Sequence, residues 1–404
     1  MFPRMAERTV ADALQDTPVV IIVGPRQCGK STLATKFGEG REYVTLDDPV
    51  FLAHATNNPA DFLHSHPAPL IIDEIQRAPG LFLPLKLAVD KARKPGSYIL
   101  TGSANVLLLP KVADSLAGRM EIIDLQPLSQ CELEGHTYNW VDDVFDNPQV
   151  LESRQDFVKL EERITRGGYP EPAQRPAKRR DPWFQSYIRT LLDRDVRDLA
   201  NIDGLTQLPK LLRLLAARSG TPLNLSGLSR ETNLPHTSIT RYVDLLKALY
   251  LIRSVPAWSA DAEVKLARTP KAYLVDTGLA CHLNQVDEKQ LTRPGDLRAA
   301  MLETFLANEL LRLIQTAEVS AELFHMRTVK NKEIPFLIEA RDGRIVAIDF
   351  QDQAVPSPQS LERLSYVKEV VGDKWHRGIW LHTGTEAKAL TSDIHAVPIS
   401  CLWS

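Results

Sequence analysis

Residues 24–31 have the residue types and spacing of a phosphate-binding loop, Gly-x-x-x-x-Gly-Lys-Ser. The loop follows five apolar residues that predict a strand, and Lys30 opens a stretch that predicts a helix. Glycine at each end lets backbone N–H groups curl around phosphates, and the helix N-terminus adds partial positive charge. Lys30 is expected to reach the β and γ phosphates of ATP, and Ser31 to give its hydroxyl to Mg²⁺. The residues expected to bind the nucleotide are Gly24, Pro25, Arg26, Gln27, Cys28, Gly29, Lys30, Ser31 and Thr32.

An acidic pair at the end of a second apolar segment completes the predicted metal site. Residues 70–73 predict a strand, which ends in Asp73 and Glu74. Asp73 is expected to hold Mg²⁺ through water, and Glu74 to polarise the attacking water as a general base. Two acids at a strand end are a weak signal alone, but downstream of the phosphate-binding loop they favour hydrolysis over passive binding.

A third apolar segment, residues 98–101, leads into small polar residues. Ser103, with Ala104 and Asn105 beside it, follows this predicted strand. A small polar side chain at such a strand end can position the lytic water, and Ser103 is our candidate for that role. A Ser or Asn here is equally suited to cap the next helix, and the sequence leaves both interpretations open.

Alternating strands and helices must position these residues. The predicted strands are residues 19–23, 43–46, 70–73, 98–101 and 121–125, and the intervening helical stretches are 30–37, 59–64 and 81–93. Such alternation is typical of an α/β domain with a parallel sheet and helices on both faces.

The composition excludes several classes of protein. A chain of 404 residues is long enough for two or three domains, and 44% hydrophobic with 25% charged residues excludes wholesale disorder. The apolar runs are far shorter than the roughly 20 residues of a membrane span. The first residues show no apolar signal core, so we expect a cytoplasmic protein with no membrane contact. A net charge of −3 excludes a global basic field, and the four scattered cysteines suggest neither zinc nor a redox couple.

Five segments match the pattern of one family. They are GPRQCGKSTL at 24–33, LIIDEIQ at 70–76, ILTGS at 99–103, SLAGR at 115–119 and PLS at 127–129. Together they resemble the prokaryotic AAA+-type P-loop ATPases that carry a C-terminal DUF4143 region, and the resemblance runs the full chain. It implies an ATPase domain at 1–160, a helical lid or linker at 161–206, a winged-helix-like domain at 207–285 and an α/β restriction-endonuclease-like domain at 286–404.

The resemblance also assigns a role to Arg119. An arginine after the fourth strand of such ATPases acts as a finger or sensor, and a guanidinium suits the spread charge of a transferring phosphoryl group. The sequence does not say whether Arg119 would act in its own subunit or across an interface of an oligomer, and a structural salt bridge is the alternative. The resemblance further suggests that residues 166–170, Arg-Gly-Gly-Tyr-Pro, form a tight hinge near the nucleotide, and that Arg194-Asp195-Val196 belong to the family pattern.

Residues 224–252 have a helix-turn-helix rhythm, with strand-like residues 251–255 as a wing. Ser226 is expected to cap the first helix, and Thr237 or Ser238 to begin the second. In a DNA reader, early side chains of the second helix would enter the major groove. The leading candidates are Thr237, Ser238 and Arg241, supported by the basic loop at 175–180. Packing against a subunit or a protein partner is an equally weighted alternative.

The predicted C-terminal domain departs from the nuclease pattern of its family. Glu303 is kept on a predicted helix, but Pro335 stands where the family has a metal-binding aspartate, and Gln351 stands where it has a lysine. Losing an acid and the lysine together should remove metal affinity and water activation. We therefore predict a nuclease-like fold without nuclease activity, whose remaining acids, Glu339 and Asp349, are solvated.

The sequence thus predicts a Mg²⁺-dependent ATPase. Its nucleotide state would control a winged-helix and nuclease-like region that acts on DNA or on a protein partner. The alternative is a nonenzymatic DNA- or protein-binding regulator that nucleotide merely stabilises. The joint presence of Lys30, Ser31, Asp73 and Glu74 favours the enzyme over the nonenzymatic regulator.

Overall fold

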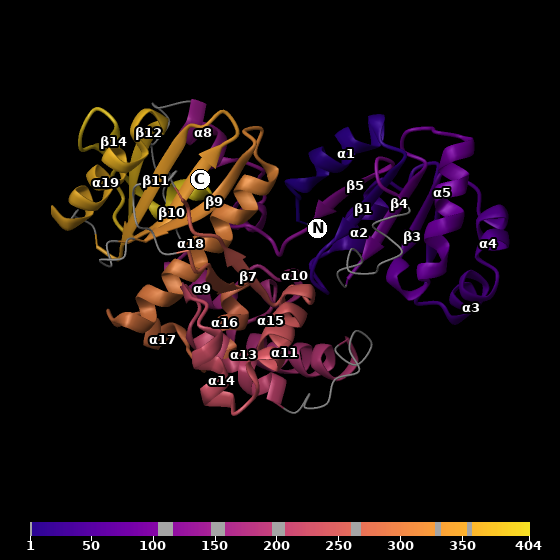
Figure 1. Ribbon diagram of the computed structural model, residues 1–404, viewed down its shortest axis with the longest axis horizontal. Coiled ribbons are helices and arrows are strands. Elements are labelled where there is room, and N and C mark those ends of the chain that lie inside the picture. Colours follow the sequence, from indigo (N-terminus) through magenta and orange to yellow (C-terminus); the bar gives the residue numbers. More distant parts are fainter. Residues whose placement is uncertain are drawn as a thin grey trace. The chain divides into compact units, whose positions relative to one another are not determined.

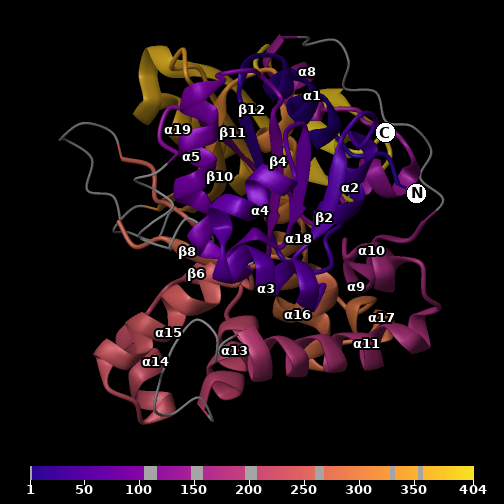
Figure 2. The same ribbon diagram turned by 90° about the vertical axis from the view of Figure 1, so that its right-hand side faces the viewer.

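The computed structural model describes residues 2–103, 116–146, 158–195, 207–259, 268–327, 333–353 and 358–404 (Figure 1, Figure 2). Ala104, Asn105, Ser115 and Val196, which the sequence analysis singled out, lie outside these residues. The chain divides into two compact units. Unit 1 comprises Met1–Leu128, Tyr169–Glu171 and Asp244–Leu251, and unit 2 comprises Ser129–Gly168, Pro172–Val243 and Ile252–Ser404.

A five-stranded parallel sheet forms the centre of unit 1, in the order β2-β3-β4-β1-β5. Its strands are β1 (Val19–Val23), β2 (Glu42–Thr45), β3 (Leu70–Asp73), β4 (Tyr98–Gly102) and β5 (Met120–Asp124). Because all neighbours are parallel, the carboxyl ends of the strands meet at one edge of the sheet. The predicted α/β domain with a parallel sheet is confirmed.

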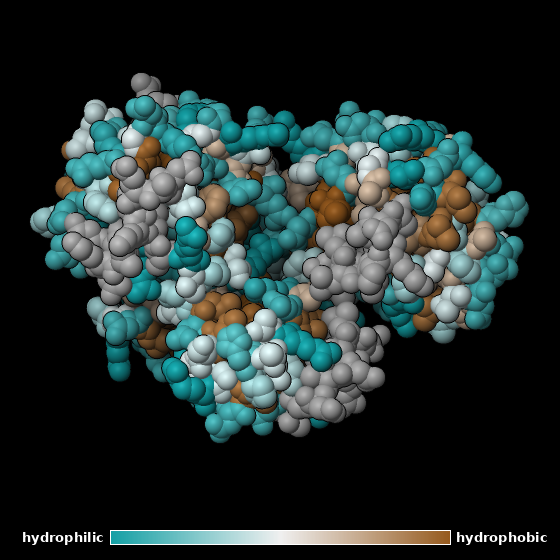
Figure 3. All heavy atoms as spheres, viewed as in Figure 1, coloured by the Kyte–Doolittle hydropathy of each residue, from teal (hydrophilic) through white to brown (hydrophobic). Residues whose placement is uncertain are grey.

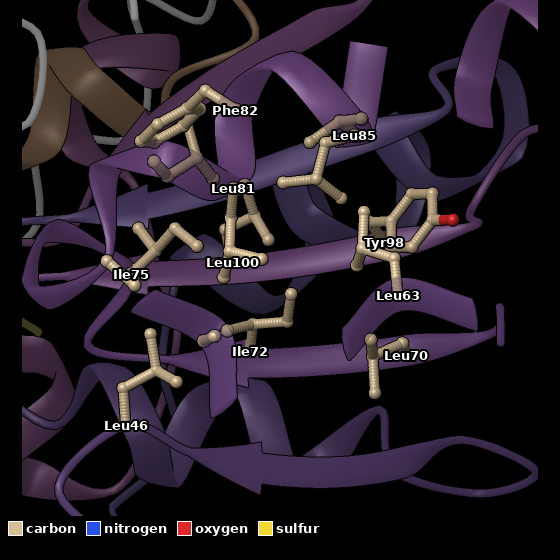
Figure 4. Close-up of a cluster of buried hydrophobic side chains, with 14 of the residues drawn as sticks. Leu46, Leu63, Leu70, Ile72, Ile75, Leu81, Phe82, Leu85, Tyr98 and Leu100 are labelled. Atoms are coloured by element: carbon tan, nitrogen blue, oxygen red, sulfur yellow. The ribbon is translucent and has the colours of Figure 1, made fainter. Parts of the chain in front are cut away.

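Helices cover both faces of this sheet. Successive side chains of β1 point to opposite faces and all are buried, so each face needs helices packed against it. Val20 and Ile22 share a core with α1 (Ala6–Asp16) and α2 (Lys30–Lys36). Val19, Ile21 and Val23 belong to the opposite core, whose helices are α3 (Pro49–Asn57), α4 (Pro59–Ser65) and α5 (Phe82–Lys91), with the short turns η1 (Ile75–Arg77) and η2 (Pro79–Leu81). Figure 4 shows this second core, where Phe82 and Leu85 lie close to Leu100.

The outer side of α5 carries exposed apolar side chains. Leu83 and Leu87, four residues apart on the helix, are 61% and 54% exposed, and hydrophobic surface is visible over α5 in Figure 3. In the part of the chain that the structure describes, no helix has the length and apolar character needed to cross a lipid bilayer.

A mixed six-stranded sheet forms the C-terminal part of unit 2, in the order β13-β14-β12-β11-β10-β9. The pairs β9–β10, β10–β11 and β13–β14 are antiparallel, and β11–β12 and β12–β14 are parallel. Its elements are α18 (Asp296–Thr316), β9 (Ala321–Arg327), β10 (Glu333–Ala340), β11 (Ile345–Gln351), α19 (Pro358–Val371), η6 (Gly372–Lys374), β12 (Trp375–His382), β13 (Lys388–Ala389), β14 (Ile394–Pro398) and η7 (Ile399–Leu402). Leu364 and Val367 of α19 pack into the core of this sheet. The chain therefore has a separate C-terminal α/β sheet domain, as expected, while its nuclease-like fold stays a prediction.

Three helices and a three-stranded antiparallel sheet follow one another in the middle of the chain. They are α13 (Leu208–Ala217), β6 (Thr221–Pro222), α14 (Leu225–Thr232), α15 (His236–Ala248), β7 (Ile252–Val255) and β8 (Lys271–Leu274), with sheet order β6-β8-β7. This is the element order expected of a helix-turn-helix with a wing, and the winged-helix assignment stays a prediction. Ser226 does not cap α14, because Oδ1 of Asn224 accepts from Gly227 N at 2.8 Å. α15 begins at His236, one residue before the predicted start.

The remaining helices among the described residues include the two that border the segment predicted to be a hinge. They are α7 (Gln130–Glu134), α8 (Trp140–Asp146), α9 (Leu160–Arg166), α10 (Pro170–Ala173), α11 (Ala177–Thr190), the π-helical turn η4 (Leu191–Asp195), α16 (Thr277–Asn284) and α17 (Glu288–Leu291). Gly167 has φ +67°, and a Cβ there would lie 2.4 Å from Oδ1 of Asp276. Gly168 N donates to Oδ2 of the same buried carboxylate at 2.6 Å. The absence of a Cβ at Gly167 thus lets the backbone approach Asp276 closely, and the hinge role stays a prediction.

Candidate active site

The turn from β1 to α2 has a backbone that only glycine can form at two positions. Gly24 has φ +150°, and a Cβ there would lie 2.1 Å from the carbonyl oxygen of Leu125. Gly29 has φ +100° and occupies the N-cap of α2. The two positions of the sequence pattern therefore require glycine for different reasons. At Gly24 the backbone of another segment approaches closely, and at Gly29 the backbone is left-handed.

The loop encloses the side chain of Lys30. Its Nζ donates to the carbonyl oxygen of Pro25 at 2.8 Å, and the residue is only 5% exposed. The ammonium is thus held within the turn where phosphates are expected. Of the other predicted nucleotide ligands, Gln27 and Thr32 are exposed and Arg26 is half-buried.

Arg4 forms hydrogen bonds to the backbone of the phosphate-binding loop, a role that the sequence analysis missed. Its guanidinium donates from Nη1 to the carbonyl oxygen of Cys28 at 2.7 Å and from Nη2 to that of Gln126 at 2.6 Å. Cys28 Sγ donates to Leu125 O at 3.2 Å, and burial raises the pKa of this thiol. Nothing in the local sequence around Arg4 signals these contacts, since the residues concerned are 24 and 122 positions away.

The predicted metal ligands Ser31 and Asp73 lie together at the carboxyl edge of the sheet. Ser31 Oγ donates to Asp73 Oδ1 at 2.7 Å. Thr101, at the end of β4, donates to the same oxygen, and Thr45, opposite Asp73 in β2, donates to Oδ2 at 3.4 Å. Both threonines were missed, because their role follows from strand order rather than from local pattern. Tyr43 of β2 is also close: burial, and then the Asp73 charge, raise the pKa of its hydroxyl.

Glu74 follows β3 in a left-handed conformation, with φ +59°. Its backbone N donates to Thr101 Oγ1 at 3.1 Å. Its Oε2 accepts a hydrogen bond from Ser103 Oγ at 2.9 Å and another from Nε2 of Gln76. Ser103 therefore lies beside the candidate base, as the water-positioning interpretation requires, and Gln76 is a neighbour that the sequence analysis did not identify.

The side chains of this site fit the nucleotide and the Mg²⁺ ion that the loop pattern implies. A serine hydroxyl and a buried carboxylate 2.7 Å apart are oxygen ligands of the kind that Mg²⁺ prefers. The loop beside them presents a lysine ammonium and the N-terminus of α2 to an anion. Ser31 and Asp73 would hold the ion, and residues 24–32 would hold the phosphates.

Arg119 lies at the other edge of the sheet. It immediately precedes β5, whose first residue pairs with Val19 at the start of β1, whereas the loop follows the end of β1. Its guanidinium bonds Asp90 at 2.6 Å (Nε to Oδ1) and 3.2 Å (Nη2 to Oδ2), and this lowers the pKa of the Asp90 carboxyl. The structure does not bring Arg119 to the loop of its own chain, and the observed contact is a salt bridge.

The predicted DNA-contacting residues lie at the start of α15. Thr237 and Arg241 are exposed, and Ser238 is half-buried. Another face of the helix is buried, with Ile239, Val243, Leu246 and Leu249 at most 2% exposed.

The acids kept from the nuclease pattern are paired with basic side chains. Glu303 Oε1 accepts from Lys271 Nζ at 2.6 Å and from Tyr273 OH at 2.9 Å, and Lys271 also contacts Glu333. Asp349 is held by Arg363, with Nη2 at 2.6 Å from Oδ2. Within the described ranges, no group of three or more His, Cys, Asp or Glu side chains could hold a metal ion.

The prediction that the remaining acids are solvated was wrong. Asp349 is 3% exposed and ion-paired with Arg363. Glu339 is half-buried, and its carboxylate accepts from Trp258 Nε1 at 3.0 Å and from Lys374 Nζ at 2.9 Å. A buried carboxylate needs a partner, and sequence pattern alone did not reveal these distant ones.

Family models match three successive parts of the chain. Residues 16–134 match an AAA domain, residues 158–290 a domain of unknown function (DUF8612), and residues 298–402 a domain of unknown function (DUF4143). The predicted resemblance to P-loop ATPases with a C-terminal DUF4143 region is therefore confirmed.

Individual relatives are also similar to this chain. The uncharacterized proteins Rv2008c of Mycobacterium tuberculosis and Mb2031c of Mycobacterium bovis are each 29% identical to it over 358 residues, which is 88% of this chain and 75% of theirs. Among solved structures, the Walker-type ATPase PABY2304 of Pyrococcus abyssi aligns with a TM-score of 0.45 at 16% identity, covering 70% of this chain and 96% of that one. A RuvB variant of Thermotoga maritima aligns with a TM-score of 0.33 at 18% identity, covering 62% and 89%.

Proposed function

We propose, on the premise that this chain combines an AAA domain with a DUF4143 domain, that it binds ATP with Mg²⁺ in unit 1 and hydrolyses it to ADP and phosphate. The observation that carries the proposal is the 2.7 Å contact between Ser31 Oγ and Asp73 Oδ1. This contact joins the phosphate-binding loop to the acidic end of β3. Glu74, which follows Asp73, is hydrogen-bonded to Ser103.

Each residue has a separate task in the proposed reaction. Mg²⁺, when held by Ser31 and Asp73, supplies charge neutralisation at the phosphates. Lys30 binds the β and γ phosphate oxygens and stabilises the charge that spreads over them. Glu74 accepts a proton from the attacking water as the new O–P bond forms and the bond to the bridging oxygen of ADP breaks.

Two substitutions separate binding from hydrolysis. Lys30→Ala should abolish binding of ATP and ADP, measured by calorimetry, together with turnover. Glu74→Gln should keep nucleotide binding and remove turnover, since an amide cannot take the proton. Lys91→Ala and Glu39→Gln make the same chemical changes at exposed positions of unit 1 and should leave both properties intact. Full turnover in Lys30→Ala would refute the proposal, and binding without any wild-type turnover would favour the nonenzymatic regulator.

The nucleotide state is further proposed to control a downstream region that acts on DNA. Exposed Thr237 and Arg241, with Ser238 between them at the start of α15, support this partner. Steady-state ATPase should rise with duplex or single-stranded DNA, and Arg241→Ala should weaken DNA binding and reduce its salt dependence. If DNA neither raises the ATPase rate nor binds to the protein, a protein partner is favoured instead.

The C-terminal domain is proposed to lack nuclease activity. Pro335 and Gln351 replace residues that the nuclease pattern needs, and Lys271 and Arg363 form ion pairs with Glu303 and Asp349. Plasmid incubated with the protein and Mg²⁺ or Mn²⁺ should stay supercoiled. Nicking that disappears in Glu303→Gln would overturn this part of the proposal.

A further inference from the structure

We propose that Gln76 is a positioning residue for Glu74, an inference that rests on the proposed hydrolysis. Together with Ser103, Gln76 fixes one oxygen of the Glu74 carboxylate, so that the other oxygen is left to take the proton of the attacking water.

The three side chains form a closed ring of hydrogen bonds. Gln76 Nε2 donates to Glu74 Oε2 and, at 3.0 Å, to Ser103 Oγ. Ser103 Oγ in turn donates to the same Glu74 Oε2 at 2.9 Å. The two amide protons and the single hydroxyl proton are all used within the ring. Two donors on one carboxylate oxygen orient the whole group, because rotation of the carboxylate would break both bonds.

The second oxygen of Glu74 stays open. Throughout the described part of the chain, no hydrogen bond reaches Glu74 Oε1, while Oε2 accepts two. Glu74 is also half-buried rather than enclosed. A carboxylate with one oxygen that accepts two hydrogen bonds and one open oxygen is arranged as a proton acceptor at a single atom.

The contact with Glu74 explains the amide orientation of Gln76. Oε1 of Gln76 is buried and has no hydrogen-bond partner among the described residues. Leaving a buried carbonyl unpaired costs free energy, yet turning the amide over would set that carbonyl against the carboxylate. The side chain thus keeps an unsatisfied acceptor in order to donate to Glu74.

The backbone that brings the pair together is itself unusual. Glu74 has the left-handed angles φ +59° and ψ +43°, which are uncommon for a residue with a side chain. This conformation turns the chain from β3 into η1, where Gln76 lies two residues further on. The turn is held by the bond from Glu74 N to Thr101 Oγ1.

Steady-state kinetics of Gln76→Leu test the inference on the full chain. Leucine keeps the approximate size of the side chain and removes both donors. We expect kcat to fall about tenfold or more while KM for ATP changes less than about twofold, since no phosphate contact is lost. Gln185→Leu, the same change at an exposed position of α11, should match the wild type.

Ser103 variants provide an independent arm if Gln76→Leu fails to fold. Ser103→Ala removes one donor and should lower kcat while KM for ATP changes less than about twofold, whereas Ser103→Thr keeps the hydroxyl and should restore kcat. Unchanged kcat in folded Gln76→Leu would overturn the inference, as would unchanged kcat in folded Ser103→Ala.

A measurement without turnover separates this inference from the proposed function. In protein labelled with ¹³C at the glutamate carboxyls, the resonance lost in Glu74→Gln identifies Glu74. At one fixed pH and without nucleotide, the chemical shift of this carboxyl should change in Gln76→Leu and keep its wild-type value in Gln185→Leu, and an unchanged shift in Gln76→Leu would refute the link between the two side chains. If the shift changes although the wild type hydrolyses no ATP, the proposed hydrolysis fails and the contact stands.

Discussion

At the scale of residues, the candidate site depends on side chains outside the phosphate-binding loop and the acidic pair. Thr45 and Thr101 donate to Asp73, Gln76 donates to Glu74, and Arg4 bonds the backbone of the loop. Each comes from a different strand or turn. The loop pattern and the acidic pair therefore locate the chemistry, while residues elsewhere in unit 1 set its geometry.

Arg4 gives the sharpest prediction at this scale. Arg4→Lys should weaken ADP binding about tenfold, because a single ammonium cannot bridge the carbonyl oxygens of Cys28 and Gln126 as the planar guanidinium does. Calorimetric titration with ADP measures the change. Arg8→Lys, at an exposed position of α1, is the matched control, and equal affinities of the two variants would contradict the role.

At the scale of elements, the tightest constraint is the turn between β1 and α2. Gly24→Ala should abolish nucleotide binding and lower the stability of unit 1, since its Cβ would lie 2.1 Å from Leu125 O and its φ is +150°. Gly80→Ala, where the nearest atom would be 3.9 Å away, should be tolerated. Thermal unfolding with and without ADP distinguishes the two, and an ADP-stabilised Gly24→Ala variant would show that the turn can yield.

The sequence predicts the elements of unit 1 well because each signal is local. An apolar run such as Val19–Val23 or Leu70–Asp73 indicates a buried strand from its own residues alone. Both strands have the predicted bounds. The cap of α14 was mistaken because Asn224 and Ser226 are both good capping residues, and only the backbone decides between them. The pairs Arg119–Asp90 and Lys271–Glu303 were not predictable, since they join residues that are distant in sequence.

At the scale of the molecule, a buried ion cluster contributes to unit 2. Lys271 is 2% exposed and contacts both Glu303 and Glu333. Lys271→Met should destabilise unit 2 by about 3–5 kcal/mol, because it leaves the Glu303 carboxylate without a cation and Glu333 with Arg327 alone, 3.9 Å away. Denaturant unfolding measures this, and adding Glu303→Gln and Glu333→Gln should recover much of the loss. No recovery in the triple variant would show that Lys271 acts by packing alone.

His325 makes the stability of unit 2 depend on pH. Burial, and then the Lys271 charge, lower the pKa of His325 to about 4. In the unfolded chain its pKa is about 6.5, so the unfolded state binds more protons between these values. Stability should therefore fall as the pH drops from 6.5 toward 4, by up to about 3 kcal/mol. Denaturation at several pH values tests this, and His325→Gln should flatten the dependence; an equal slope in that variant would assign it to other groups.

The contacts behind the phosphate-binding loop have one more consequence. Gly24 packs on Leu125 O, Cys28 donates to the same atom, and Arg4 ties Cys28 O to Gln126 O. Leu125 and Gln126 belong to the last stretch of unit 1 before the chain continues at Ser129 into unit 2. The hydrogen bonds that fix the backbone of the loop therefore also fix residues 125–126, so a substitution that breaks them changes the surroundings of both segments.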